Sequence, residues 1–300
     1  MPARHVAVAL LIALVWGLNF VAIDVGLETF PPLLFVALRF LLTAIPAVFL
    51  VKRPGVPWRW VIASGAFLTV GQFGLLFVGI YAGVPAGLSS IILQLQVLFT
   101  IAFAVVVLGE RPTRAQLVGA AIAIGGLAVV AGARSASVPL TALLFVVGAA
   151  ASWGAGNIST RLAQPRDAFS LLVWASAVGP LPLFALSLLI EGPDAIGAAF
   201  ASIGWEAILS LAYIVILATL FGWSAWTWLL SRHPASTVAP FGLLAPIAAL
   251  LSTWALRGEQ PSVMELVGGA LILAGLAVAL LRRRSAPALG DLSAPLTLAP

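Results

Sequence analysis

The segment Gly109-Glu110-Arg111-Pro112, which leads into Leu117-Val118-Gly119, has a second copy in this chain. That copy is Gly258-Glu259-Gln260-Pro261, which leads into Leu266-Val267-Gly268. At this offset of 149 positions, residues 109–130 match residues 258–279 at eleven of twenty-two places. A weaker match pairs Trp16-Gly17 with Trp153-Gly154 at an offset of 137, and a longer connection at residues 191–204 would absorb the difference. The sequence therefore predicts an internal repeat.

The composition predicts that lipid surrounds most of the folded chain. Of the 300 residues, 62% are hydrophobic and 8% are charged, whereas about a quarter of the residues of a soluble domain are charged. Since a membrane helix needs about 20 apolar residues, the chain divides into ten candidate spans. The first contains Trp16, Asn19 and Asp24, and we expect an uncleaved helix rather than a signal peptide there. The predicted spans are residues 6–25, 32–51, 60–81, 84–108, 115–131, 138–160, 168–190, 205–230, 235–256 and 261–281.

The distribution of basic residues predicts the orientation, because basic residues collect on the cytoplasmic side of a membrane. With a cytoplasmic N-terminus and ten crossings, only Arg134 and Arg257 fall outside, and Arg39 falls within a span. Both termini are then cytoplasmic, and a Pro/Ala-rich tail at residues 285–300 is expected to be disordered. The inside segments hold the other twelve basic residues: Arg4, Lys52, Arg53, Arg59, Arg111, Arg114, Arg161, Arg166, Arg232 and Arg282–Arg284.

The repeat unit contains five helices, so its second copy enters the membrane from the opposite side. We expect an all-α polytopic membrane protein with a first unit at residues 1–134 and an inverted second unit at residues 135–284. Inverted repeats are typical of secondary transporters, which bind solutes near the bilayer midplane between the two copies. The sequence therefore favours a solute transporter in an inner, or plasma, membrane.

Other classes of protein find less support. Cysteine is absent and His5 and His233 are the only histidines, so we expect no metal or other cofactor. The net charge of +5 is not gathered into a soluble patch, which argues against nucleic acid as a partner. The catalytic motifs of membrane enzymes are absent from the sequence, so we expect that the protein is not an enzyme. An intramembrane enzyme, a lipid-handling protein without a solute path, a scaffold and a channel remain alternatives, and either a monomer or a homodimer is compatible with the sequence.

Several short motifs give the chain a family resemblance over residues 5–282: Trp16-Gly17-Leu18-Asn19-Phe20, Ala37-Leu38-Arg39-Phe40, Pro85-Ala86-Gly87-Leu88, Gly109-Glu110-Arg111 and Ser152-Trp153-Gly154 with Asn157. The chain resembles the drug/metabolite transporter superfamily, in particular the EamA family of ten-helix proteins built from two five-helix repeats, and within it bacterial exporters of amino acids and cysteine-pathway metabolites. This resemblance implies export of amino acids or close derivatives. Gln260 stands where the first copy has Arg111, so we do not assign the family role of that arginine to Gln260.

Polar residues inside the predicted spans are candidates for a substrate site, because buried polar groups are costly in a membrane. Arg39 could hold a substrate carboxylate with its forked donors, or could instead form an ion pair with Asp24 or Glu28 or snorkel outward to the membrane surface. Two further pairs each lie on one helix face, at spacings of three and four residues. They are Trp16 with Asn19 and Trp153 with Asn157, which could face each other across the repeat axis or simply join helices.

The remaining candidates are three glutamines and a few residues of the second half. Gln94 and Gln96 point in different directions on a helix, so one could line a cavity while the other bonds a neighbouring helix. Gln72, Trp174, Ser176 and Tyr213 are further candidate lining residues. The sequence also predicts an interfacial aromatic belt at Trp223, Trp226 and Trp228, and close packing of the fifth and tenth spans, or a dimer contact, through Ala121, Gly125, Ala270 and Ala274. Few carboxylates lie inside the spans, which favours transport without proton coupling.

Overall fold

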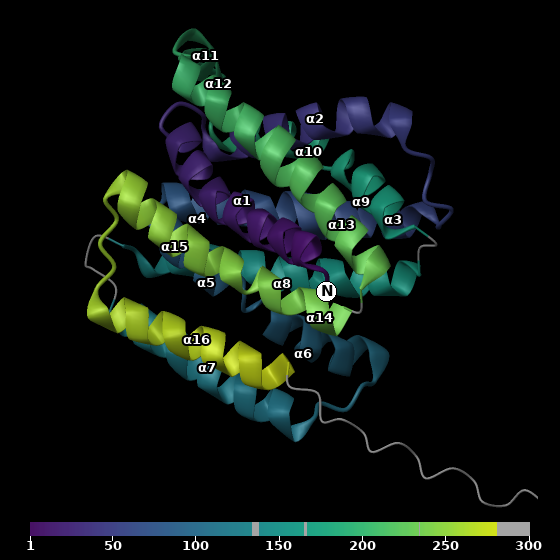
Figure 1. The fold of residues 1–300 in the computed structure, drawn as a ribbon. Coiled ribbons are helices and arrows are strands. Elements are labelled where there is room, and N and C mark those ends of the chain that lie inside the picture. Colours follow the sequence, from purple (N-terminus) through teal and green to yellow (C-terminus); the bar gives the residue numbers. More distant parts are fainter. Residues whose placement is uncertain (134–137, 165–166, 234, 281–300) are drawn as a thin grey trace, which may run out of the picture.

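The computed structural model describes residues 1–133, 138–164, 167–233 and 235–280, and in these ranges the regular elements are all helices (Figure 1). The first half contains α1 (Ala3–Leu27), α2 (Pro32–Leu50), α3 (Trp58–Gly65), the π-helix η1 (Ala66–Gly71), α4 (Gln72–Tyr81), α5 (Ala86–Leu93), α6 (Gln96–Leu108) and α7 (Arg114–Ala133). The second half contains α8 (Leu140–Ala163), α9 (Ala168–Ser176), α10 (Pro180–Ile190), α11 (Pro193–Ala201), α12 (Trp205–Ala212), the π-helix η2 (Tyr213–Phe221), α13 (Gly222–Arg232), α14 (Ala235–Gly242), α15 (Leu244–Arg257) and α16 (Val263–Leu280).

Nine helical segments of the described chain are long and apolar enough to cross a membrane, and α15 is a shorter apolar helix. The prediction of an all-helical polytopic membrane protein is confirmed at this level. The ninth predicted span, residues 235–256, is divided into α14 and α15 at Leu243. Pro246 explains this break, because a proline removes the hydrogen bond to the residue four positions earlier, here Gly242, and its ring clashes with that carbonyl.

Two further spans are interrupted, and one predicted loop is helical. Pro180 lies four residues after Ser176, where α9 ends, so the missing proline donor again coincides with a break. A tight turn at Gln94 and Leu95 separates α5 from α6, and it was not predicted. The longer connection predicted at residues 191–204 contains the short helix α11, which was not predicted. The predicted tail at 285–300 and the predicted basic residues Arg134, Arg166 and Arg282–Arg284 lie outside the described residues.

Helices α7 and α16, the fifth and tenth predicted spans, pack side by side along their lengths (Figure 1). The contact runs through glycines: a Cβ on Gly119 would lie 2.3 Å from the carbonyl oxygen of Gly275, and one on Gly126 would lie 2.6 Å from that of Gly268. Ala121, Gly125, Ala270 and Ala274 are all exposed, so they do not form this contact, and their alternative role in a dimer contact stays a prediction. Both faces of these helices carry small residues four apart, so spacing alone could not select the packed face.

Polar contacts define two ends of the bundle. At the acidic end, Arg257 of α15 bonds Asp24 and Glu28 at the end of α1. Glu191 accepts hydrogen bonds from the first amides of α2, and Glu259 accepts from the first amides of α5. At the opposite, basic end, where Lys52 and Arg53 follow α2, Arg161 at the end of α8 bonds Glu110 after α6. Glu110 and Glu259, which occupy equivalent positions in the sequence repeat, therefore lie at opposite ends of α5 and α6.

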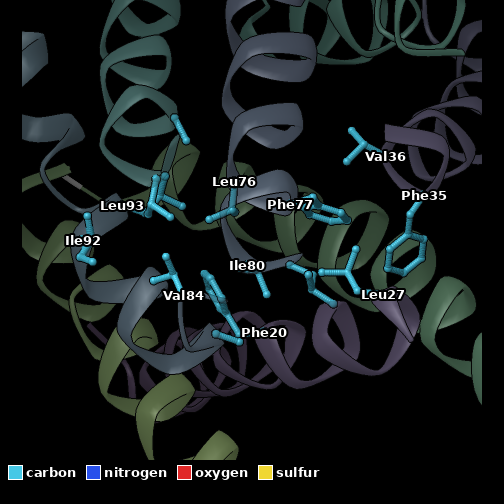
Figure 2. Packing of buried hydrophobic residues seen from close by; sticks show 14 of the residues in the cluster. Phe20, Leu27, Phe35, Val36, Leu76, Phe77, Ile80, Val84, Ile92 and Leu93 are labelled. Atoms are coloured by element: carbon cyan, nitrogen blue, oxygen red, sulfur yellow. The ribbon is translucent and has the colours of Figure 1, made fainter. Parts of the chain in front are cut away.

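The acidic half of the bundle is filled by apolar side chains from α1, α2, α4 and α5 (Figure 2). Phe35 stacks 5.3 Å from Phe30 and meets Phe77 at 5.4 Å between ring centroids. Aromatic pairs at this separation stabilise a core beyond their burial alone. These side chains form a packed apolar plug in the acidic half of the described structure. The side chains drawn and labelled in Figure 2 are Phe20, Leu27, Phe35, Val36, Leu76, Phe77, Ile80, Val84, Ile92 and Leu93.

Candidate functional site

A cavity of about 240 Å³ lies in the other half of the bundle, between helices of both sequence halves. Its walls are the C-terminal halves of α2 and α8, the segment from α3 to α4, helix α9, and the segment from η2 to α13. Each of these parts leads towards the basic end. The lining residues are Arg39, Phe40, Thr43, Ala47, Ser64, Leu68, Thr69, Gln72, Phe73, Trp153, Asn157, Thr160, Phe169, Leu171, Leu172, Val173, Ala175, Ser176, Thr219, Leu220, Trp223, Trp226, Thr227 and Leu230.

Both π-helices contribute to this cavity, η1 through Leu68 and Thr69 and η2 through Thr219 and Leu220. They occur in the same place of the two halves, within the third and eighth predicted spans. A π-helical segment displaces the following side chains relative to a regular helix and is frequent at functional sites. Here the hydroxyl of Thr219 donates to the carbonyl of Ile214, five residues earlier, over 2.6 Å. The wall of the cavity therefore deviates from regular helix in both halves.

Arg39 places a guanidinium in the wall of the cavity, where its side chain is 2% exposed. Its Nη2 donates to the hydroxyl of Thr219 over 3.0 Å, and its Cζ lies 4.2 Å from the ring centre of Phe73. Its Nε and Nη1 are buried without a hydrogen-bond partner among the described residues. Asp24 and Glu28 bond Arg257 instead, so the predicted alternative of an ion pair with Arg39 is wrong.

Arg39 is also the only ionisable group among the lining residues of the described structure. The remaining polar lining consists of amides and hydroxyls, and aromatic rings form much of the rest. A buried guanidinium with free donors is costly until an anion pairs with it. The electrostatics of the cavity therefore favour a ligand with one carboxylate, which can accept the forked donors that Arg39 leaves unused.

Three more of the predicted site residues line this cavity with Arg39: Gln72, Trp153 and Asn157. Ser176 lines it as well. Asn157 bonds Gln96 and Thr100 of α6 through its Nδ2, over 2.9 and 3.0 Å. Gln96 therefore joins helices behind the wall, as expected for one member of the Gln94 and Gln96 pair.

The other predicted residues lie apart from the lining. Trp16 donates to the carbonyl of Ala218, and Tyr213 donates to that of Val15. Trp174 donates to the carbonyl of Val51 at the basic end. Asn19 is buried, and its Oδ1 has no partner among the described residues. Gln94 lies in the turn between α5 and α6.

The cavity also contains residues that sequence reasoning assigned elsewhere. Trp223 and Trp226 line it, so their prediction as an interfacial belt was wrong. Their rings lie 5.4 and 5.3 Å from the ring of Trp16, which forms a second layer behind them. Trp228 does not line the cavity, and its ring lies against His5 and Arg232 at the basic end. The signal that could have identified Trp223 and Trp226 was their spacing of three residues, which puts both on one helix face.

Comparisons with known proteins agree on one family. The model of the EamA-like transporter family matches this chain twice, over residues 4–132 and 140–281. A "Probable amino-acid metabolite efflux pump" of Salmonella typhimurium is 44% identical over 274 residues, which cover 89% of this chain and 92% of that protein. A protein of the same name from Escherichia coli is 37% identical, with coverage of 92% and 94%. One solved crystal structure shares the fold, with a TM-score of 0.58 at 21% identity over 93% of this chain and 97% of that one.

Proposed function

Because this chain belongs to the EamA-like transporter family, and is a multi-pass membrane transporter rather than an enzyme, we propose that it exports small amino-acid metabolites across the inner membrane. The observation that carries the proposal is the guanidinium of Arg39 in a cavity between the two halves, because its Nε and Nη1 have no hydrogen-bond partner among the described residues. An amino-acid metabolite supplies the carboxylate that this group lacks. The names of the two efflux pumps point to the same class of compound.

The proposed architecture has ten spans, with α14 and α15 together forming the ninth, in two inverted units at residues 1–134 and 135–284. The position of the two Gly-Glu-x-Pro segments supports the inversion, because Glu110 and Glu259 lie at opposite ends of the bundle. Lys52 and Arg53 after α2, together with Arg161 and Arg232 in the last turns of α8 and α13, support a cytoplasmic basic end and cytoplasmic termini. This arrangement is typical of carriers whose two repeats rock around a central site.

The proposed transport cycle starts from the conformation described here. The cavity lies in the basic half, and the acidic half is closed by the apolar plug and by the ion pairs of Arg257. A substrate entering from the cytoplasm would meet Arg39 at the deep end of this cavity. Export then requires the acidic half to open and the basic half to close, which is alternating access.

The proposed substrate contacts are Arg39 for the carboxylate and Gln72, Trp153 and Asn157 for the rest of the molecule. The volume of about 240 Å³ lies below the range of about 300–1,000 Å³ that is typical of drug-sized ligands, which favours a small metabolite. Trp16, Gln96, Trp174 and Tyr213 are proposed to support this wall rather than to touch the substrate. Asn19 and Gln94 are proposed as path residues of another conformation.

Counterflow in proteoliposomes tests this function. Vesicles would be loaded with one unlabelled amino acid, and the same amino acid, labelled, would be added outside. The assay would be repeated for each of the twenty amino acids, with one uncharged sugar as a control. We expect saturable uptake of at least one amino acid and none of the sugar. Uptake that never saturates would indicate a channel, and no uptake of any amino acid would refute the proposal.

A further inference from the structure

The amide of Asn157 is held by α6 behind the cavity wall, and its orientation can be worked out from hydrogen counting. Thr100 has one hydroxyl hydrogen, and this hydrogen goes to the carbonyl of Gln96, 2.7 Å away, because a carbonyl can only accept. The oxygen of Thr100 must therefore act as an acceptor towards Asn157. The atom of Asn157 that lies 3.0 Å from it must be the donor, Nδ2.

Gln96 completes this arrangement. Nδ2 of Asn157 has two hydrogens, and the second goes to Oε1 of Gln96 over 2.9 Å. Both donors of the amide are then used on α6, on the far side of Asn157 from the cavity. The carbonyl oxygen Oδ1 has no hydrogen bond within the described residues and is left on a side chain that lines the cavity.

The backbone around Asn157 keeps these partners close. A Cβ on Gly154, one helical turn before Asn157, would lie 2.7 Å from Cβ of Phe99 and 2.9 Å from the amide nitrogen of Thr100. Glycine is therefore needed for α6 and α8 to approach each other at this level. The close approach lets the side chains of Gln96 and Thr100 reach Asn157 from α6.

From these contacts we propose that Thr100 and Gln96 orient Asn157 so that its Oδ1 accepts a hydrogen bond from the amino group of the substrate. Arg39 offers only donors to the cavity, and Asn157 offers an acceptor. Together they select molecules that carry both a carboxylate and an N–H donor. Trp153, four residues before Asn157 on the same face, adds an aromatic ring that attracts an ammonium group.

This inference rests on the proposed export of amino-acid metabolites and adds a basis for discrimination within that class. Without the hydroxyl of Thr100, the amides of Asn157 and Gln96 can turn over together and still bond each other. An inverted Asn157 would present N–H groups to the cavity, where they face the amino group of the substrate. Thr100 and Gln96 are thus positioning residues, since neither lines the cavity.

The test compares two probes in counterflow: the L-amino acid that the native protein transports best, and its des-amino analogue, in which hydrogen replaces the amino group. The measured quantity is the ratio of their kcat/KM values. We expect the native protein to prefer the amino acid by about tenfold, as one hydrogen bond to a charged group provides. Thr100→Val should reduce this ratio towards one. Asn157→Leu should remove the preference, so that the ratio equals one.

Two matched variants serve as controls. Thr100→Ser keeps the hydroxyl and should keep the native ratio. Ser159→Ala removes a hydroxyl that bonds only the carbonyl of Ala155 within α8, and it should also keep the ratio. A native ratio in Thr100→Val, or equal transport of both probes by the native protein, would overturn the inference. If the native protein transports no amino acid at all, the proposed function itself has failed.

Discussion

Replacing Arg39 with leucine is expected to weaken substrate binding without weakening the fold. The two donors that lack partners, Nε and Nη1, are the ones available to a carboxylate. Each hydrogen bond to a charged group contributes at least about 1.5 kcal/mol, so the loss of two amounts to about 3 kcal/mol. Since each 1.4 kcal/mol is a factor of ten, KM should rise by roughly two orders of magnitude.

The stability of the same variant separates binding from a structural role. Arg39 is a buried charge with one hydrogen bond and one close aromatic ring, and leucine removes the cost of burying that charge. We therefore expect the midpoint of thermal unfolding of purified Arg39→Leu to equal or exceed that of the native protein. Arg39→Lys keeps the charge but loses the fork, and its KM should fall between the two.

The assay is counterflow over a range of substrate concentrations, with thermal unfolding measured on the same preparations. Thr219→Val is the matched control, because it removes the one hydrogen bond of the guanidinium and leaves the charge. It should raise KM by about fivefold, the equivalent of one ordinary hydrogen bond of about 1 kcal/mol. An unchanged KM in Arg39→Leu, or a large loss of thermal stability, would refute this reasoning.

Three other predictions concern packing, gating and coupling. Gly119→Val should lower the free energy of unfolding by about 1–3 kcal/mol, because the backbone of Gly275 occupies the space that the new side chain needs. Gly125→Val, whose side chain would face open space, should leave the free energy of unfolding unchanged, and thermal unfolding measures both. Arg257→Gln should loosen the acidic end, where the partly exposed ion pairs of Arg257 are worth only about 1 kcal/mol together. A cysteine placed at buried Ala207 should then react with an impermeant maleimide about fivefold faster than in the protein with Arg257. An unchanged rate would argue against a role of these ion pairs in closing the acidic end. Counterflow and export should proceed without an imposed proton gradient, because no carboxylate or histidine is among the described residues that line the cavity. Strict dependence on such a gradient would contradict this.

The sequence predicted the helices better than it predicted their breaks and faces. Apolar length was sufficient to predict the nine candidate spans and the shorter apolar helix of the described chain, because it is a local property of the sequence. The interruptions before Pro180 and Pro246 follow from proline chemistry, but a proline inside a span does not always end a helix: Pro46 remains within α2. The turn at Gln94 and Leu95 has neither proline nor glycine, and nothing in its sequence marks it.

The candidate site depended on contacts that are remote in sequence. Arg39 was identified as a basic residue inside a span, but its partner Thr219 lies 180 residues away, and no spacing rule connects them. Trp223 and Trp226 resembled interfacial residues because tryptophan is common at that depth. The contact between α7 and α16 was predicted for the right pair of helices, but it uses another face than the one with Ala121, Gly125, Ala270 and Ala274, since small residues recur on more than one face. The residues that line the cavity are thus set by tertiary packing between the halves.

Side-specific labelling tests the central claim, the inversion of the two units, most directly. The chain has no cysteine, so Thr113→Cys and Gln260→Cys each create one reactive site, in the two copies of the Gly-Glu-x-Pro segment. In intact cells, an impermeant maleimide should label Gln260→Cys at once and Thr113→Cys only after the membrane is permeabilised. Labelling of both from the same side would contradict the inverted arrangement and, with it, the route proposed for the substrate.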